Sequence, residues 1–438
     1  MNTFAIETLG CKVNQYESRQ IRELLERLDL THVETGQTPD LVVVNTCCVT
    51  HTASAKSRQY IRKIQKHSPY ATIVVAGCLP VGQINELKDI SNDANIHIVR
   101  QKNELAGTLS NLIRNSGYNR TLFPAKIKDK TRSPCENNPN QFKILHSYAR
   151  QSRAFLKIQD GCDGYCSYCI VPKIRNKIIN KPVKDVLHEA YNLLYARHAE
   201  IVLTGIFLGA YGQNTVRRKK WQNNKTDSLA DLLTKIARID GLKRIRLSSL
   251  EPADVTDKLL ETFVKYDNIM PHLHLALQSG SPQILEKMRR QYTIDEFIVI
   301  LEKLRKTLDT PAITTDIIVG FPGETEEDFQ KTFDFAEKCR FSKIHVFSYS
   351  QRLGTAAAEM PDKVPPQVIK KRSLQLRQLD QKLQKEFRSQ FIGQKVQIVV
   401  EDTNPVKGRT ERYFLAQFPE IKPDSIKKGD ILSAIYNH

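Results

Sequence analysis

The sequence predicts an α/β protein with two parallel-sheet domains and a small β domain at its C-terminal end. Short β-branched runs alternate with helical periodicity from residue 4 to about 115, and the same alternation returns between 155 and 348. From residue 393 onward, apolar and polar residues alternate. Alternating strands and helices are typical of parallel sheets covered by helices, whereas period-two alternation is typical of half-buried strands. A length of 438 residues fits about three domains.

The first domain, residues 1–115, is expected to be a Rossmann-like parallel sheet. The run at 41–46, Leu-Val-Val-Val-Asn-Thr, is apolar enough to be a fully buried strand. The first predicted helix carries Ile21, Leu24, Leu25 and Leu28 on one face. The predicted strands are 4–10, 41–46, 72–77 and 96–99, and the predicted helices are 15–28, 54–67 and 103–114.

Residues 116–147 are expected to form a basic linker. Gly117 and three prolines interrupt both strand and helix patterns there. Between 120 and 132 the segment holds five positive charges against one negative charge. A charge run is usually a solvated face, but this one can also face an anion.

A second α/β domain is predicted at 148–390. Six strand–helix units without a second core predict an open or partial (β/α)6 barrel, with its active site at the carboxyl ends of the strands. The predicted strands are 155–159, 200–204, 243–249, 272–278, 313–319 and 343–348. The predicted helices between them are 183–198, 227–238, 253–266, 293–308 and 324–338.

The sequence of the last part of the chain predicts a long helix that is followed by a small OB-like β-barrel at 391–438. After Pro365 and Pro366 a helix is expected to reach about residue 388, with apolar residues at spacings of 3, 4 and 4. The tail then alternates, and further short strands are expected around 412–417 and 430–435.

The charge balance predicts a polyanionic partner. Lysine and arginine number 66 against 48 acidic residues, a formal charge of +18, although charge alone does not distinguish RNA from DNA or an acidic protein. Besides the linker, basic residues gather at 217–220 beside Trp221 and on the helix from 368. No run approaches 18 apolar residues and no secretory signal is visible, so we expect a cytoplasmic protein that does not contact membranes.

The nine cysteines point to metal ligation rather than to disulfides, because an odd number in a reducing compartment is unlikely to form a disulfide framework. Cys162, Cys166 and Cys169 form a C-x3-C-x2-C set directly after the first predicted barrel strand. Structural zinc sites normally use four protein ligands, and no fourth cysteine or histidine follows nearby. Three thiolates on a four-iron cluster leave one iron open for another ligand. A zinc knuckle or simple burial is the alternative.

Cys11, Cys47 and Cys78 follow three successive predicted strands of the first domain. The carboxyl ends of parallel strands lie along one edge of a sheet, so these thiols are expected to converge although they are more than 30 residues apart. The alternative is that all three are merely buried. The remaining cysteines, Cys48, Cys135 and Cys339, fit neither set and are interpreted as bystanders.

Several short motifs accompany these two sets, and together with them the chain resembles the radical S-adenosylmethionine (SAM) methylthiotransferase family over nearly its whole length. The motifs are LGCKVNQYES at 9–18, NTC at 45–47, GC at 77–78, GCDGYCSYCIVP at 161–172, RLSSLEP at 246–252, LQSGS at 277–281, GFPGET at 320–325 and GT at 354–355.

The resemblance implies two [4Fe-4S] clusters and SAM as cofactors. Cys162, Cys166 and Cys169 would hold the cluster that binds SAM, and Cys11, Cys47 and Cys78 an auxiliary cluster. Tyr168 is expected to lie against the SAM adenine, and Gly320 and Gly323 are expected in the SAM region. The family joins a methylthio group to a carbon from which a radical has removed hydrogen. Such chemistry offers no acidic proton, so no catalytic histidine is expected.

The first motif and the run Ser-Tyr-Ser-Gln-Arg at 348–352 most resemble the family branch that acts on N6-threonylcarbamoyladenosine at tRNA position 37. This resemblance implies methylthiolation at adenine C2, the tRNA anticodon loop as partner, an RNA-binding TRAM domain at the C-terminal end, and an electron donor such as flavodoxin or ferredoxin. The alternatives are N6-isopentenyladenosine of tRNA, an aspartate of ribosomal protein S12, and a non-catalytic iron–sulfur protein. Asn176 and Phe207 depart from the family pattern, which puts the shape of the substrate pocket near Phe207 in doubt.

Overall fold

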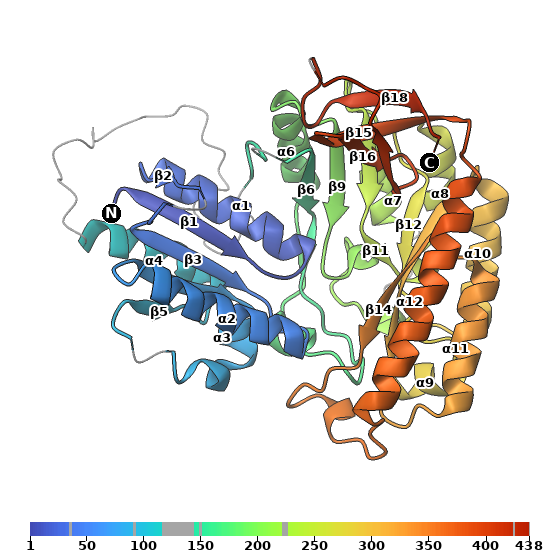
Figure 1. Cartoon of the computed structure of the whole chain (residues 1–438), viewed down its shortest axis with the longest axis horizontal. Helices are drawn as coiled ribbons and strands as arrows, with labels where there is room; N and C mark the ends of the chain where they lie inside the picture. Colours follow the sequence, from blue (N-terminus) through green and yellow to red (C-terminus); the bar gives the residue numbers. More distant parts are fainter. Residues whose placement is uncertain are drawn as a thin grey trace. The chain divides into compact units, whose positions relative to one another are not determined.

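The fold is described from a computed structural model, over residues 1–34, 37–90, 93–115, 144–148, 151–220, 227–423 and 425–437 (Figure 1). The chain divides into two compact units, residues 1–145 and 146–438, each described by itself below. Most of the predicted basic linker lies outside the described residues, as do Cys135 and Trp221. None of the described helices has the length and apolar character needed to cross a membrane.

The first unit contains a five-stranded parallel sheet, as predicted, with the strand order β2-β1-β3-β4-β5. All six residues of β3 are buried, which explains their uninterrupted apolar character. Ile21 and Leu25 of α1 pack with Val43, Val74 and Leu109 in one core. The strands are β1 (Thr3–Thr8), β2 (Thr31–His32), β3 (Leu41–Thr46), β4 (Thr72–Gly77) and β5 (Ile96–Ile98), and the helices are α1 (Lys12–Arg27), α2 (His51–His67), α3 (Leu79–Gly82) and α4 (Lys102–Asn115).

The second unit contains the predicted half-barrel, in which six parallel strands follow one another in chain order. The third strand is interrupted at Ser248, so that it forms β10 and β11. The strands are β6 (Arg153–Lys157), β9 (Glu200–Thr204), β10 (Arg244–Leu247), β11 (Ser249–Leu250), β12 (His272–Leu275), β13 (Ala312–Val319) and β14 (Lys343–Ser348).

Helices cover the outer side of these strands, and Figure 1 shows α10, α11 and α12 outside the yellow and orange strands. Thr293 and Thr325 begin α10 and α11 with reciprocal capping boxes, which explains why these helices start where they do. The helices are α5 (Val171–Ile174), α6 (Val183–Tyr195), α7 (Ser228–Ala237), α8 (Asp257–Lys265), α9 (Pro282–Lys287), α10 (Ile294–Thr307), α11 (Glu326–Cys339) and α12 (Pro366–Ser389). The short strand β7 (Gln159–Asp160) pairs antiparallel with β8 (Ile179–Asn180), and α5 lies between them in the chain.

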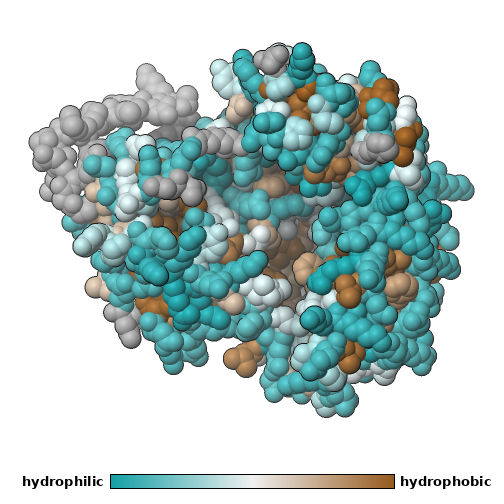
Figure 2. Space-filling view, in the orientation of Figure 1, coloured by the Kyte–Doolittle hydropathy of each residue, from teal (hydrophilic) through white to brown (hydrophobic). Residues whose placement is uncertain are grey.

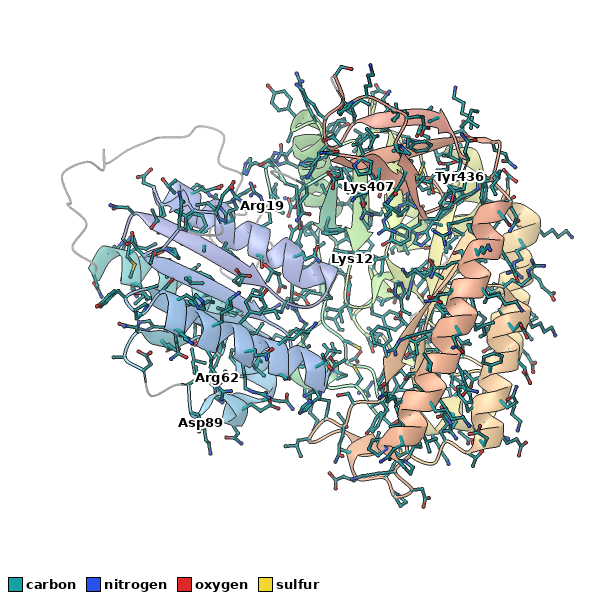
Figure 3. The ribbon with its side chains drawn as sticks, viewed as in Figure 1. Lys12, Arg19, Arg62, Asp89, Lys407 and Tyr436 are labelled. Atoms are coloured by element: carbon teal, nitrogen blue, oxygen red, sulfur yellow. The ribbon has the colours of Figure 1, made fainter. Side chains whose placement is uncertain are left out.

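The small C-terminal β domain takes the form of a four-stranded antiparallel sheet with the order β17-β16-β15-β18. Tyr436, labelled in Figure 3, lies 5.2 Å from Phe414 between ring centroids in its core. The strands are β15 (Lys395–Thr403), β16 (Val406–Thr410), β17 (Leu415–Phe418) and β18 (Ile431–Ile435). The sequence did not predict β16, because its run Val-Lys-Gly-Arg-Thr has little β-propensity and is fixed by pairing with β15.

A buried ion-pair cluster fixes this sheet to the amino ends of the barrel strands. The two carboxylate oxygens of Glu200 lie 3.1 Å from Nε of Arg244 and 3.1 Å from Nε of Arg246, respectively. Arg246 also donates to the carbonyl of Thr410 at 3.0 Å. Burial would raise the pKa of Glu200, but Arg246, Arg244 and Arg153 together hold it down to about 2. The C-terminal sheet therefore covers the end of the half-barrel opposite to the cysteine loop.

Candidate functional site

The three cysteines of the first unit lie at one edge of its sheet, as predicted. β1, β3 and β4 are neighbours, and Thr8 pairs with Asn45 while Thr46 pairs with Gly77. Cys47 and Cys78 follow β3 and β4 directly, and Cys11 begins α1 three residues after β1. Three loops from three adjacent strands thus bring these thiols to the carboxyl edge of the sheet.

Close packing holds these loops together. Gly10 has φ +105°, and a Cβ added there would lie 2.9 Å from the sulfur of Cys47. The side chain of Asn14 donates to the carbonyls of Leu9 and Thr46, at 2.8 and 2.9 Å. Asn14 therefore ties the first loop to the second, a role that sequence reasoning missed although this residue lies within the quoted LGCKVNQYES motif.

The three thiols differ in exposure. Cys11 is exposed, whereas Cys47 and Cys78 are buried. Cys48 is buried as well, and its sulfur lies 3.3 Å from the carbonyl oxygen of Cys78. Cys48 is therefore turned toward backbone, which is consistent with its interpretation as a bystander.

The second set, Cys162, Cys166 and Cys169, lies on a single loop after β7, and all three residues are partly exposed. The backbone of Cys162 donates to the carbonyl of Arg175 at 2.8 Å. Gly161 starts the loop with φ +84°, and a Cβ there would lie 1.8 Å from the carbonyl oxygen of Lys177. Only glycine fits this turn without displacing the chain.

Asp163 anchors the same loop to the segment 215–217. Its carboxylate accepts from the hydroxyl of Thr215 at 2.7 Å and from the backbone of Val216 at 2.8 Å. Arg217 lies 3.6 Å from this carboxylate. Near the other end of the loop, the backbone of Ser167 donates to the carbonyl of Met288 at 3.1 Å, so the loop has anchors near both of its ends.

The donor chemistry of this loop fits an iron–sulfur cluster. Burial raises the pKa of Cys162 to about 11, and burial together with Cys166 raises that of Cys169 to about 12. Both thiols are therefore protonated at neutral pH, and a bound metal has to displace these protons. Three soft thiolates with no fourth cysteine nearby in the sequence suit a four-iron cluster with one open iron.

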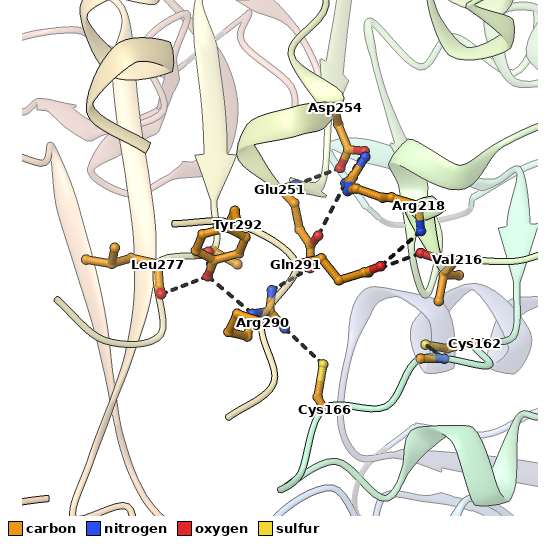
Figure 4. Close-up of polar contacts among 12 residues, drawn as sticks. Cys162, Cys166, Val216, Arg218, Glu251, Asp254, Leu277, Arg290, Gln291 and Tyr292 are labelled. Atoms are coloured by element: carbon orange, nitrogen blue, oxygen red, sulfur yellow. Dashed lines mark hydrogen bonds and ion pairs between the residues drawn. The ribbon is translucent and has the colours of Figure 1, made fainter. Parts of the chain in front are cut away.

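A cationic network lies beside these cysteines (Figure 4). The guanidinium of Arg290 donates to the sulfur of Cys166 at 3.1 Å and to the hydroxyl of Tyr168 at 3.3 Å, and it pairs with Glu251. Tyr292 lies under the same guanidinium and donates to the carbonyl of Leu277 at 2.8 Å. Arg290 thus places a positive charge next to the sulfur of Cys166.

A second arginine completes this network. Arg218 contacts Glu251 at 3.2 Å and Asp254 at 2.7 Å, so Glu251 bridges two arginines. The guanidinium of Arg218 also lies 5.6 Å from the ring centroid of Phe207, the residue that departs from the family pattern. Sequence reasoning quoted Glu251 only as part of a motif and missed Arg290, because an arginine pair at 289–290 is typical of a solvated surface.

The predicted contacts of Tyr168, Gly320 and Gly323 with SAM stay predictions. Tyr168 packs edge-on against Phe321, with ring centroids 6.5 Å apart. Gly320 and Gly323 have φ of +77° and +76°, and a Cβ on Gly320 would lie 2.4 Å from Ile369 of α12. Backbone shape and helix packing therefore already require glycine at 320.

The predicted basic surfaces are only partly available to an anion. Within the run at 217–220, Arg217 and Arg218 pair with acidic side chains, whereas Lys219 and Lys220 are exposed. On α12, Arg372 is buried against Glu324. Figure 2 shows a largely hydrophilic surface over the part of the molecule where Figure 1 places α10 and α12. The exposed lysines, more than the arginines of 217–220, are the candidates for phosphate contacts.

Among solved structures, the fold resembles that of the radical SAM methyltransferase TsrM from Kitasatospora setae. The TM-score is 0.56 and the identity 14%, and the match covers 82% of this chain and 77% of the other. At this identity the likeness concerns the fold alone.

Known families and curated proteins match the chain more closely. Residues 156–336 match the Radical SAM superfamily, and residues 3–98 match the family described as Uncharacterized protein family UPF0004. A protein of Bacillus subtilis (strain 168) named threonylcarbamoyladenosine tRNA methylthiotransferase MtaB is 35% identical, over 100% of this chain and 95% of its own length. The protein of the same name from Thermotoga maritima is 34% identical, over 92% and 87%.

A differently named relative is almost as similar. The tRNA-2-methylthio-N(6)-dimethylallyladenosine synthase of Corynebacterium efficiens is 32% identical, over 98% of this chain and 82% of its own length. Identity above 30% along the whole chain, together with a cysteine loop at the end of the first strand of a half-barrel, shows that the chain belongs to the radical SAM methylthiotransferase family.

Proposed function

We propose that this protein adds a methylthio group to C2 of N6-threonylcarbamoyladenosine at tRNA position 37, next to the anticodon. The observation that carries the proposal is the 35% identity, over the full chain, to a relative named for threonylcarbamoyladenosine. The two cysteine sites support it, because a radical SAM methylthiotransferase needs a site for SAM cleavage and a site for sulfur.

Membership in a radical SAM family implies SAM and a [4Fe-4S] cluster as cofactors. We assign this cluster to Cys162, Cys166 and Cys169, and a second, auxiliary cluster to Cys11, Cys47 and Cys78. When bound, the first cluster supplies an electron that cleaves SAM, and the second holds the sulfur to be methylated. The supporting observation is that the first unit brings three cysteines to the carboxyl ends of three neighbouring parallel strands, whereas the second unit carries three cysteines on one loop that follows the first strand of the half-barrel.

The chain's own residues prepare the first site for this chemistry. Arg290 donates to Cys166 and places a positive charge beside its sulfur. Glu251 holds the Arg290 guanidinium, and Tyr292 lies against it. Burial raises the pKa of Tyr168, so its phenol stays protonated and remains a hydrogen-bonding, packing group.

The domains and partners follow from this assignment. We propose a methylthiotransferase N-terminal domain at 1–115, a basic linker at 116–147, a radical SAM core at 148–390 and a TRAM domain at 391–438. The TRAM domain and the exposed lysines of α12 would hold the phosphates of the anticodon loop, because such contacts position RNA without reading its sequence. The modified base would be flipped into the barrel. A cytoplasmic flavodoxin or ferredoxin would supply electrons.

Mass spectrometry of tRNA nucleosides tests the proposal. A strain that lacks the gene is complemented with the wild-type protein or with the Cys162→Ala variant. We expect 2-methylthio-N6-threonylcarbamoyladenosine to disappear from the deletion strain, its unmethylthiolated precursor to accumulate, and only the wild-type protein to restore it.

The same measurement distinguishes the alternatives. Loss of 2-methylthio-N6-isopentenyladenosine instead would assign the protein to the dimethylallyl branch, to which the relative from Corynebacterium efficiens belongs by name. If both methylthio nucleosides were unchanged, tRNA would be excluded, and the mass of ribosomal protein S12 would be measured next.

A further inference from the structure

A group of metal-ligating side chains lies inside the second unit, separate from both cysteine sets. His274 of β12, Asp316 of β13 and His345 of β14 offer one ligand atom each, and these atoms lie within 4.8 Å of one another. Over the part of the chain that the structure describes, this is the one group of three such side chains that meets that distance. Sequence reasoning missed it because the three residues are 29 or more positions apart and belong to no metal motif.

The strand register explains why these residues meet. Asp316 pairs with His345, and His274 pairs with Thr314, two residues before Asp316 on the same strand. Side chains alternate along a strand, so all four residues lie on one face of three adjacent strands. Ser348, three residues after His345 on the opposite face, contacts Ser373 of α12. The group therefore lies on the face turned away from α12.

This face extends from the end of the half-barrel that carries the cysteine loop to the end that contacts the C-terminal domain. Ile318, two residues after Asp316, packs against the same buried apolar cluster as Tyr168 of the cysteine loop. At the other end, the ring of His272 stacks on Tyr413 of the C-terminal domain, 4.2 Å between centroids. The group thus lies inside the half-barrel, between the proposed SAM site and the C-terminal sheet.

The orientation of His274 points to a ligand. Its side chain is 11% exposed, and its Nδ1 lies 2.9 Å from the hydroxyl of Thr314, which fixes the ring. Its Nε2 lies 3.2 Å from Oδ2 of Asp316 but, among the described residues, makes no hydrogen bond. A buried ring nitrogen that makes no hydrogen bond costs free energy unless another group satisfies it.

We propose that His274, Asp316 and His345 form a site for a divalent transition-metal cation. Two imidazoles and one carboxylate suit Zn²⁺, Mn²⁺ or Fe²⁺ better than Ca²⁺ or Mg²⁺. Ligand atoms about 2.1 Å from a metal lie roughly 3 to 4 Å apart, so small side-chain rotations close the observed spacing. Three ligands on one side leave coordination positions open toward the barrel interior for an oxygen ligand, either water or an anionic group of a substrate.

Electron paramagnetic resonance (EPR) tests this site in the full-length protein with its iron–sulfur clusters reconstituted. Mn²⁺ is titrated, and the signal of unbound Mn²⁺ gives the number of bound ions. We expect one bound Mn²⁺ per chain, displaced by Zn²⁺, and at least a tenfold weaker affinity in Asp316→Asn and His345→Gln. The matched control is His188→Gln on α6, whose exposed side chain lies outside the group and whose substitution should leave binding unchanged.

Absence of stoichiometric binding in the wild-type protein would overturn the proposal. So would equal binding in the two site variants, or an equal loss in His188→Gln. If the variants fail to fold, pulsed EPR on wild-type protein with bound Mn²⁺ decides the question by itself. Couplings to the nitrogens of two imidazoles support the site, whereas couplings to water alone exclude it.

Discussion

The two cysteine sites are built in opposite ways. In the second unit, one loop carries all three cysteines within eight residues, and hydrogen bonds near both of its ends fix its shape. In the first unit, three loops contribute one cysteine each, and the site exists only when β1, β3 and β4 are paired in register. A local site can bind metal in a partly folded chain, whereas a non-local site depends on the whole sheet.

Two matched cysteine variants should show the largest difference. Cys166→Ala is expected to abolish SAM cleavage and methylthiolation, because it removes one of the three ligands that we propose for the cluster that binds SAM. Cys78→Ala should abolish methylthiolation but retain SAM cleavage under a chemical reductant. Production of 5′-deoxyadenosine and of the methylthio nucleoside measures the two activities. Full methylthiolation by Cys78→Ala would contradict the assignment of a second cluster to Cys11, Cys47 and Cys78.

Alkylation rates of Cys11 and Cys169 in the metal-free protein should differ by roughly a hundredfold or more at pH 8, since the thiolate is the reactive form. Burial raises the pKa of Cys169 to about 12, so its alkylation should be slow and should accelerate about tenfold per pH unit up to that pKa. Cys11 is exposed and should react fast. Iodoacetamide labelling followed by peptide mass spectrometry gives each rate.

Cys339 is the control for this experiment, because it is buried outside both sites and burial raises its pKa to about 12 as well. Labelling of Cys169 as fast as that of Cys11 at pH 8 would mean that the cysteine loop is open in the metal-free protein.

Substitution of Arg290 should have a smaller effect that is confined to the second unit. Arg290→Ala removes the cation beside Cys166, which should lower the reduction potential of the cluster and slow SAM cleavage roughly tenfold, as for other groups that orient metal ligands. Arg290→Lys keeps the charge and should recover part of the rate. Redox titration followed by EPR measures the potential. An unchanged potential in Arg290→Ala would contradict a role for this charge.

Gly10→Ala should act on the first unit alone and cause a loss of about half of the iron, from about eight to about four atoms per chain. A methyl group there meets the side chain of Cys47, and φ is +105°, so the first loop has to move. Iron analysis after reconstitution checks this result, and SAM cleavage should persist.

Gly107→Ala on α4 is the matched control, because a Cβ at that position has nothing within 4 Å. This variant should keep all its iron and gain about 0.5 to 1 kcal/mol of stability, since alanine favours a helix over glycine. Equal iron loss in both glycine variants would mean that the effect at Gly10 is not local.

Much of the fold was predictable from local patterns. The runs at 41–46, 72–77 and 343–348 form β3, β4 and β14 with the predicted bounds. A short apolar or β-branched run of this length is typical of a buried strand. The α12 helix was predicted from four apolar residues, and all four are buried. By contrast, β16 was not predicted, because its polar run with a glycine has no strand pattern of its own and is held in a strand by pairing with β15.

The sequence by itself determined the order of the βα units, the spacing of the C-x3-C-x2-C loop and the family, because these depend on neighbouring residues and on motifs. Only the tertiary structure decided which charges and ring nitrogens meet. It paired Arg217 and Arg218 with acidic side chains, placed Arg290 beside Cys166, and brought His274, Asp316 and His345 together. Such contacts join residues far apart in the chain, and strand register rather than local pattern selects them.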